Sequence, residues 1–334
     1  MNKGIALAGN MIVDNVKYIE SYPPAQTLTT ISGGAHSTGG LTCNCALTLA
    51  KLDPTLPLCA LGMVGEDAAG DYILSQLAAQ PNIDTSGVRR GGVTAYTDVM
   101  TDKDGGRTFF HCRGANALFA PEHIDLDNLR ADILHIGYIL LLDAMDAPDA
   151  DYPTALCRVL HEAQKRGIAT SVDVVSEDGD RFAGLVPPAL RYTDYCIINE
   201  VEAECSTGIP LRDAAGTLCK ENLEPACRAL MEMGVARWVV IHMPECGAGL
   251  AKDGEFVCLP SRRVPDGFIK SSVGAGDAFA SGILYGAYHG WTLEKSIGIA
   301  AAVAAWSLSG AGAADAIVPL GELLAGMQAL SERE

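Results

Sequence analysis

A short glycine-rich stretch near the C-terminus combines a carboxylate with a potential anion-binding loop. It reads Gly274-Ala275-Gly276-Asp277, follows an apparently extended segment and opens an alanine-rich run that predicts a helix. Main-chain amides at a helix N-terminus, assisted by the helix dipole, bind anions such as a phosphoryl group, and glycines allow the backbone to approach closely. Asp277 could take a proton from an attacking hydroxyl. The alternative is an aspartate that only caps the helix.

Three upstream motifs join this stretch in a pattern that spans most of the chain. They are Gly39-Gly40-Leu41-Thr42-Cys43-Asn44, the glycine- and acid-containing run 61–70, and Asn199-Glu200-Val201-Glu202. In this order, the four motifs resemble the signatures of the ribokinase-like carbohydrate kinases, the PfkB family. The resemblance implies an enzyme that transfers a phosphoryl group from ATP to a hydroxyl of a small sugar or sugar derivative.

The resemblance assigns the binding of this acceptor to the N-terminal half. Asp14 falls where the family has a substrate-binding aspartate, and Gly39, Gly40 and Asn44 would complete that pocket. A carboxylate that accepts two hydroxyls suits a polyol, although a turn cap is the alternative for Asp14. Asp277 would be the general base, and the backbone of Gly274, Ala275 and Gly276 would form the anion hole.

Two further acceptor-site candidates come from the residues themselves. His111 and Arg113 end the strand-like segment 107–113, where they could reach a bound substrate or its transferring phosphate. An exposed strand with alternating polar faces is the competing interpretation.

Donor binding is implied for the C-terminal half, with ATP and Mg²⁺. Asn199 and Glu202 fall where the family holds Mg²⁺ and phosphates, usually through water, and a strand followed by a capped helix is the alternative. Asp173, His242 and Gly247 fall in segments that the family places near the nucleotide.

Three departures from the family pattern concern the donor side. Pro244 replaces a glycine of the nucleotide motif, and proline lacks an amide donor. Val175 replaces an asparagine that usually follows Asp173. Ser271-Ser272-Val273 lacks a carboxylate often linked to a monovalent-cation site, so the family's potassium activation is in doubt for this chain.

The elements that must position these residues alternate along the C-terminal two-thirds. Short β-branched runs predict strands over 133–142, 169–175, 195–199 and 237–242, and helices are predicted over 153–166, 223–233, 276–289 and 293–309. Asp253-Gly254 predicts a hairpin turn. The alternation predicts a doubly wound α/β fold, with a mainly parallel sheet covered by helices on both faces.

The N-terminal third adds a predicted lid. Alternating strand-like residues over 17–31 and 93–112 surround Pro23-Pro24 and the turn Asp104-Gly105-Gly106, which predicts a small antiparallel sheet over a cleft. Residues 1–13, 34–91 and 115–330 would form the core, and residues 14–33 and 92–114 the lid. Because an open sheet edge invites pairing, we expect a homodimer through the lid.

Composition excludes some partners and places the chain. With 24 basic and 41 acidic residues, the formal charge is -17, which disfavours nucleic acid and anionic membrane surfaces. Eleven cysteines without a C-x-x-C pair predict free thiols. No apolar stretch reaches the roughly 20 residues of a membrane span, and the N-terminal apolar run is too brief for a signal peptide. These features predict a cytoplasmic protein.

Two alternatives to a sugar kinase stay open. A nucleoside kinase would present similar hydroxyls to Asp14 and Asn44, with a base slot supplied by Tyr96, Phe109 and Phe110. A non-catalytic sugar or nucleoside sensor would keep the pocket without turnover. The sequence contains no P-loop, dinucleotide fingerprint or G-x-S-x-G motif, so other nucleotide-binding folds and hydrolases are disfavoured.

Overall fold

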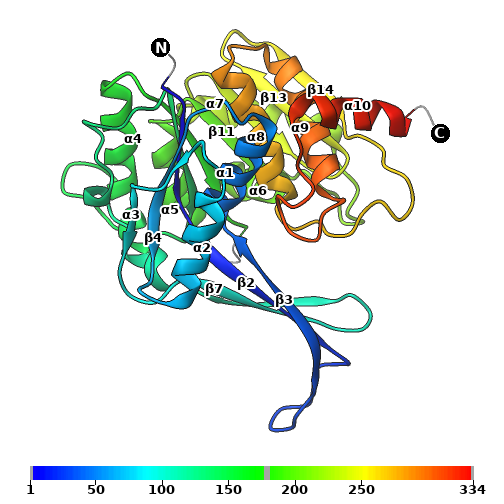
Figure 1. The fold of residues 1–334 in the computed structure, drawn as a ribbon. Helices are drawn as coiled ribbons and strands as arrows, with labels where there is room; N and C mark the ends of the chain where they lie inside the picture. The colour runs from blue at the N-terminus through cyan, green and yellow to red at the C-terminus, as the bar shows by residue number, and fades with distance from the viewer. Residues whose placement is uncertain (1–2, 177–180, 332–334) are drawn as a thin grey trace.

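The main body of the protein is one large, mainly parallel sheet (Figure 1). A computed structural model describes residues 3–176 and 181–331. The strand order is β14-β13-β12-β11-β10-β9-β1-β4-β5, and β6 also pairs with β4. The strands of this sheet are β1 (Ile5–Gly9), β4 (Leu58–Val64), β5 (Ile83–Asp84), β6 (Val88–Arg90), β9 (Ile133–Ile139), β10 (Ala169–Val174), β11 (Tyr195–Asn199), β12 (Trp238–His242), β13 (Cys246–Ala251) and β14 (Phe256–Pro260).

Helices cover both faces of this sheet, as the sequence predicts for a doubly wound fold. One hydrophobic core is formed with α4 (Ala155–Lys165), α5 (Phe182–Leu190), α6 (Glu200–Thr207) and α7 (Leu223–Glu232). The other is formed with α1 (Leu41–Leu52), α2 (Ala68–Ala78), α8 (Ala275–Tyr288) and α9 (Leu293–Ser307), and α10 (Leu320–Ser331) packs on α9. The remaining helices are α3 (Asp143–Asp146), η1 (Gly114–Leu118), η2 (Pro121–His123) and η3 (Lys220–Asn222).

The predicted crossover elements are confirmed to within a few residues at their ends. Strand β11 matches its predicted range, and α7, α8 and α9 begin within one residue of theirs. The Asp253-Gly254 turn joins the antiparallel strands β13 and β14. The eleven cysteines all lie among the described residues and none of them forms a disulfide bond, as expected. None of the helices among the described residues is long and apolar enough to cross a bilayer.

A second sheet projects from the body as a lid (Figure 1). Its order is β3-β2-β7-β8, with β2 (Ile12–Ile19), β3 (Ile31–Gly39), β7 (Tyr96–Thr101) and β8 (Arg107–Cys112). β7 and β8 lie within the expected segment 92–114, whereas β2 begins at Ile12 and β3 continues to Gly39, beyond the expected segment 14–33. The stretch around Pro23-Pro24 connects β2 and β3 instead of forming a strand, since proline removes ladder donors.

The expectation of a purely antiparallel lid is wrong. β2 pairs antiparallel with β3 and β7 with β8, but β2 and β7 are parallel. β2 follows β1 and β7 follows β6, and both β1 and β6 run parallel to β4. The chain therefore enters the lid twice in the same direction, which makes the central pair parallel.

Candidate active site

The predicted site residues gather at one edge of the large sheet. In a parallel sheet the carboxyl ends of the strands meet at the same edge, where ligands bind. Strand β11 ends at Asn199 and β12 at its neighbour His242, while Asp173 lies next to the end of β10. The lid strand β2 and helix α1 start from the same edge, directly after β1 and β3.

Asp277 lies in the first turn of α8 and is held by two side chains. It is 5% exposed, so its carboxylate is nearly enclosed but not sealed. Asn44 donates its amide Nδ2 to Oδ2 at 2.8 Å, and the Tyr138 hydroxyl donates to Oδ1 at 2.6 Å. Burial raises the pKa of Asp277, and the two hydrogen bonds offset part of that rise. A raised pKa makes the carboxylate a stronger base than an exposed aspartate.

The glycine at the start of α8 is required by its surroundings. Gly274 is the N-cap and has a φ of 75°, a region that residues with a side chain rarely adopt. A Cβ added to Gly274 would lie 2.2 Å from the Cβ of Ala313. A Cβ on Gly276 would lie 3.0 Å from the His242 ring. Residues 274–277 thus form a tight turn whose backbone leads directly into the helix N-terminus.

Asp14 comes from the lid and lies close enough to Asp277 for their charges to interact. It lies on β2, and a Cβ on Gly39 of the adjacent strand would be 2.2 Å from its Oδ2, so glycine is needed there. Burial, followed by the charge of Asp277, raises the pKa of Asp14 to about 6, although the Thr97 hydroxyl lowers it. Two carboxylates that influence each other in this way suit a ligand with several hydroxyl donors between them.

Gly40 and Asn44 begin helix α1. Gly40 is its N-cap and its carbonyl accepts the Asn44 amide. Asn44 is buried, bonds to Asp277 and lines a cavity of about 110 Å³ that reaches between α1, α2 and the loop 312–315. The lid, α1 and α8 therefore meet around Asn44.

Sequence reasoning missed Tyr138. It is the penultimate residue of β9, at the carboxyl edge, and the pKa of its hydroxyl is raised well above the usual range by burial and by nearby carboxylates. The hydroxyl therefore stays protonated and acts as a donor to Asp277. A signal was available, because a tyrosine at the end of a predicted buried strand is a polar group aimed at the ligand edge.

Asn199 and Glu202 form a capping box at the start of α6, so the capped-helix interpretation is correct as a description of the motif. Glu202 is buried, and its carboxylate accepts the Asn199 amides and the Ser176 hydroxyl. Burial raises the pKa of Glu202 to about 7. The pKa of Asp173 is raised by burial and then by the charges of Glu202 and Asp277.

These carboxylates fit Mg²⁺ held largely by water. Glu202 and Asp277 each repel Asp173 electrostatically, which a divalent cation would relieve. Within the described ranges, no three His, Cys, Asp or Glu side chains form a metal cage by themselves. Mg²⁺ usually keeps several waters and takes one or two carboxylates plus phosphates, so the residues present suit that ion better than a cation that needs an all-protein site.

His242 and Gly247 face each other across the β12–β13 pair. The His242 ring lies 5.2 Å from that of Phe279, and burial lowers its pKa to about 4, so it is neutral. A Cβ on Gly247 would lie 2.8 Å from Phe279. His242 and Gly247 therefore both pack against helix α8, next to the 274–277 turn.

His111 and Arg113 separate at the root of the lid. His111 lies on β8 and its Nδ1 is 3.0 Å from the Thr97 hydroxyl, in the cross-strand row that contains Asp14. Arg113 instead donates to the Leu140 carbonyl at 2.8 Å and pairs with Asp143. The structure brings His111 toward the Asp14 side, while Arg113 ties the lid to the end of β9.

Comparison with known proteins gives consistent matches over the full length. The profile described as pfkB family carbohydrate kinase matches residues 2–319. A deoxyribokinase of Salmonella typhi is 24% identical over 310 residues, which cover 92% of this chain and 93% of the relative.

Two solved structures show the same fold. Arabidopsis thaliana ribokinase complexed with ribose and ATP has a TM-score of 0.80 at 21% identity, covering 98% of this chain and 99% of that one. A putative ribokinase II from E. coli in complex with ATP and Mg²⁺ has a TM-score of 0.75 at 17% identity, covering 100% of both chains. The predicted ribokinase-like fold is confirmed. Because the family match takes in all four sequence motifs, the chain belongs to the pfkB family of carbohydrate kinases and is a phosphotransferase.

Proposed function

We propose that this protein transfers the γ-phosphoryl group of ATP to a hydroxyl of a small sugar or sugar derivative, with Asp277 as general base. The observation that carries the proposal is the Asp277 carboxylate at the N-terminus of α8, held by Asn44 and Tyr138 with its pKa raised by burial. A base and an anion-binding helix terminus meet there in one turn.

In this mechanism the acceptor oxygen attacks the γ-phosphorus while its proton passes to Asp277, and ADP leaves. Amides of residues 274–277 stabilise the charge on the transferring group. The enclosed setting of Asp277, which is 5% exposed, keeps water from competing with the acceptor. Positioning and charge stabilisation supply most of the rate in phosphoryl transfer.

Asp14, Gly39, Gly40 and Asn44 are proposed to bind the acceptor. Asp14 is mostly ionised at neutral pH, since its pKa is about 6, and it accepts hydroxyls that donate toward β2. Close contact between Asp14 and the Gly39 backbone limits that side of the pocket. His111 faces the same row through Thr97, whereas Arg113 is proposed to act by anchoring the lid.

Asp173, Asn199 and Glu202 are proposed to hold Mg²⁺ through water, and His242 and Gly247 to support the nucleotide-binding surface. When bound, Mg²⁺ neutralises charge on the donor phosphates. Burial raises the pKa values of Asp173 and Glu202, and a bound cation would stabilise the ionised form of both carboxylates. Undiminished turnover in excess EDTA would contradict this assignment.

An ADP-coupled assay of the purified protein tests the proposal. The panel contains ketoses, pentoses, sugar acids and nucleosides, and ATP without acceptor measures background hydrolysis. We expect ADP release that depends on one class of acceptor. A protein that binds a sugar but releases no ADP with any acceptor would be the non-catalytic sensor.

A nucleoside acceptor is favoured by one feature of the lid. Phe109 is 59% exposed, and the alternation along β8 places it on the same face as His111. An exposed ring on the acceptor side of the lid offers a stacking surface for a base. Higher kcat/KM for nucleosides than for free sugars in the same panel would select this alternative.

The lid is also proposed to form a homodimer interface. Its outer strands β3 and β8 have unpaired edges, and Ile31, Phe109 and Phe110 are more than half exposed on them. Exposed apolar side chains on open edges favour association with a second copy. Sedimentation analysis should give twice the chain mass, and a monomer mass at micromolar concentration would contradict the proposal.

Replacing Tyr138 by phenylalanine should lower kcat roughly 10-fold, as expected for one hydrogen bond to a charged group. The variant removes the 2.6 Å bond to Asp277 and keeps the ring. Because that bond lowers the pKa of Asp277, its loss should shift the acid limb of the pH–kcat profile to higher pH.

Tyr152→Phe is the matched control for Tyr138→Phe. The Tyr152 hydroxyl contacts His161 at 3.0 Å, away from the carboxyl edge, so neither kcat nor the profile should change. A Tyr138→Phe enzyme with an unshifted profile would show that the hydroxyl has only a structural role.

A further inference from the structure

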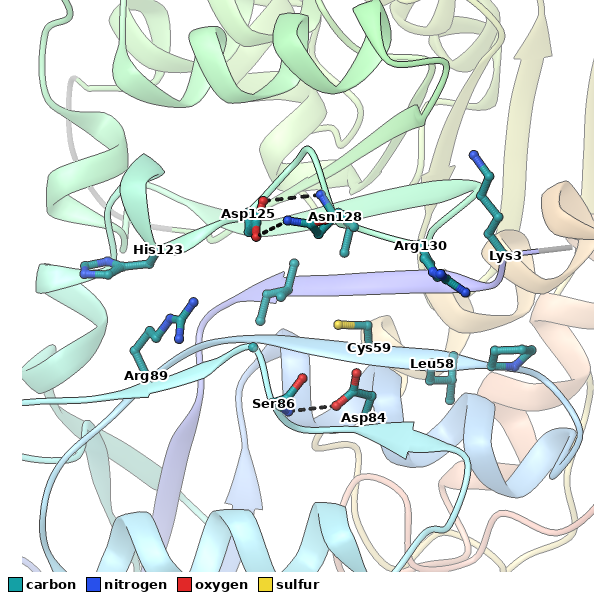
Figure 2. A pocket seen from close by; sticks show the side chains of 14 residues that line it. Lys3, Leu58, Cys59, Asp84, Ser86, Arg89, His123, Asp125, Asn128 and Arg130 are labelled. Carbon is teal, nitrogen blue, oxygen red and sulfur yellow. Dashed lines mark hydrogen bonds between the residues drawn. The ribbon is translucent and has the colours of Figure 1, made fainter.

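A cavity of about 530 Å³ lies between two walls of the core, away from Asp277. One wall is the segment from β5 to β6, and the other is the segment from η2 to residue 130. Leu58, Cys59 and Leu61 of β4 form its largely apolar floor. Figure 2 shows Arg89 and His123 near one end of the cavity and Lys3 and Arg130 near the other.

The cations that line this cavity, Lys3, Arg89 and Arg130, outnumber its two carboxylates, Asp84 and Asp125. In the described part of the chain, Lys3, Arg89 and Arg130 form no ion pair, although most other arginines do. The two carboxylates that line the cavity are hydrogen-bonded to neighbouring amides, and the charge of Arg89 also lowers the pKa of Asp125. Asp84 accepts the Ser86 amide, and Asp125 accepts the backbone and side-chain amides of Asn128. The lining of this cavity therefore carries a small excess of positive charge, in a chain with a formal charge of -17.

His123 adds a donor at the Arg89 end. Its Nδ1 accepts the Ala120 amide at 3.0 Å, so the neutral ring carries its proton on Nε2. The ring is also stacked on Phe119, with centroids 6.1 Å apart. Its orientation is therefore fixed without any contribution from a ligand.

We infer that this cavity is a binding site for a small organic bisphosphate, with one phosphate at each end and the carbon skeleton over the β4 floor. Arginine forms paired hydrogen bonds with phosphate, and lysine supplies a point charge. The apolar floor between two cationic ends matches a carbon skeleton between two anionic ones. This site is separate from the acceptor and donor sites, and the inference does not depend on the proposed function.

Both walls of the cavity are connected along the chain to the lid. The segment 84–90 continues directly into β7, and the segment 121–130 follows β8 through η1. One wall therefore precedes the β7–β8 hairpin in the sequence, and the other wall follows it. Arg90, next to Arg89, donates to the Gly65 carbonyl and pairs with Asp71, which ties this wall to the start of α2. A ligand that bridges the walls would restrain both connections together.

Isothermal titration calorimetry with hexane-1,6-diyl bisphosphate tests the inference. This probe has a phosphate at each end and no free hydroxyl, so it cannot serve as an acceptor. We expect it to bind at least 10-fold more tightly than hexyl monophosphate. Arg89→Gln and Arg130→Gln should each weaken its binding roughly 10- to 100-fold, the loss expected for one charge-assisted contact.

Arg191→Gln is the matched control, since Arg191 is an exposed arginine outside the cavity, and it should leave the affinity unchanged. Hydrogen exchange should show protection by the bisphosphate in 84–90 and 121–130. No measurable binding, equal affinity for the monophosphate, or binding that survives both cavity substitutions would each overturn the inference. The Arg89→Gln and Arg130→Gln proteins are expected to melt within about a degree or two of the parent, because both arginine side chains are exposed and surface substitutions change stability little.

Discussion

Replacing Asp277 by asparagine should lower kcat by about 10²–10⁴-fold, the usual contribution of a general base, while the protein stays folded. The asparagine has the same shape but cannot take the proton of the acceptor. Loss of a base required only in the transition state should lower kcat and kcat/KM together. The measurement is kcat in the ADP-coupled assay, with affinity for ATP·Mg²⁺ measured by calorimetry as a check of the donor site.

Two features of the site make the folding control for Asp277→Asn informative. Burial raises the pKa of Asp277, so the ionised carboxylate opposes folding at neutral pH and its removal relieves that cost. Against this, the new amide must face either the Asn44 amide or the Tyr138 hydroxyl, both of which donate to the carboxylate. We expect a small net change in melting temperature. A folded variant with kcat within threefold of the parent would exclude Asp277 as the base.

Local sequence signals were sufficient for the helix-borne part of the site. Gly274 and Gly40, which precede Asp277 and Asn44, are the N-caps of α8 and α1. Both have a positive φ that favours glycine, so their positions in the sequence indicate where the two helices begin. The same holds for Asn199 and Glu202, whose capping box is encoded within four residues. Such contacts span short sequence distances, so residue type and spacing predict them.

Contacts between distant segments were harder to predict. Tyr138 reaches Asp277 across 139 residues, and its role depends on the length of β9 and on the height at which α8 begins. The parallel β2–β7 pair joins segments about 80 residues apart, and its direction follows from where the chain leaves the large sheet. Sequence alternation predicts that these strands exist, but it contains no information on which strands become neighbours.

Replacing Asp14 by asparagine should lower kcat/KM for the acceptor by about 10²–10³-fold, mainly through KM. Hydrogen bonds to a charged group contribute about 1.5–3 kcal/mol each, and the proposal gives Asp14 two acceptor hydroxyls. For the parent, kcat/KM at saturating ATP·Mg²⁺ should fall as the pH drops through about 6, the pKa of Asp14, because the protonated carboxyl accepts hydroxyls poorly. In the variant the part of this acid limb that is due to Asp14 should be lost, so that only the limb of the base Asp277 remains.

Asp98→Asn is the control on the same lid. Asp98 follows Thr97 on β7 and pairs with Lys17 on the opposite face, so its replacement should leave kcat/KM unchanged. Thermal unfolding separates binding from folding. The pKa of Asp14 is raised in the folded state by burial and by Asp277, so stability associated with this group is present at low pH and lost as the pH rises through about 6. At pH 7 the uncharged Asp14→Asn protein should therefore melt at the same or a higher temperature than the parent. A variant with lower kcat/KM and an equal or higher melting temperature would identify Asp14 as a carboxylate retained for acceptor binding. A variant that melts at a lower temperature, or that keeps the kcat/KM of the parent, would contradict that role.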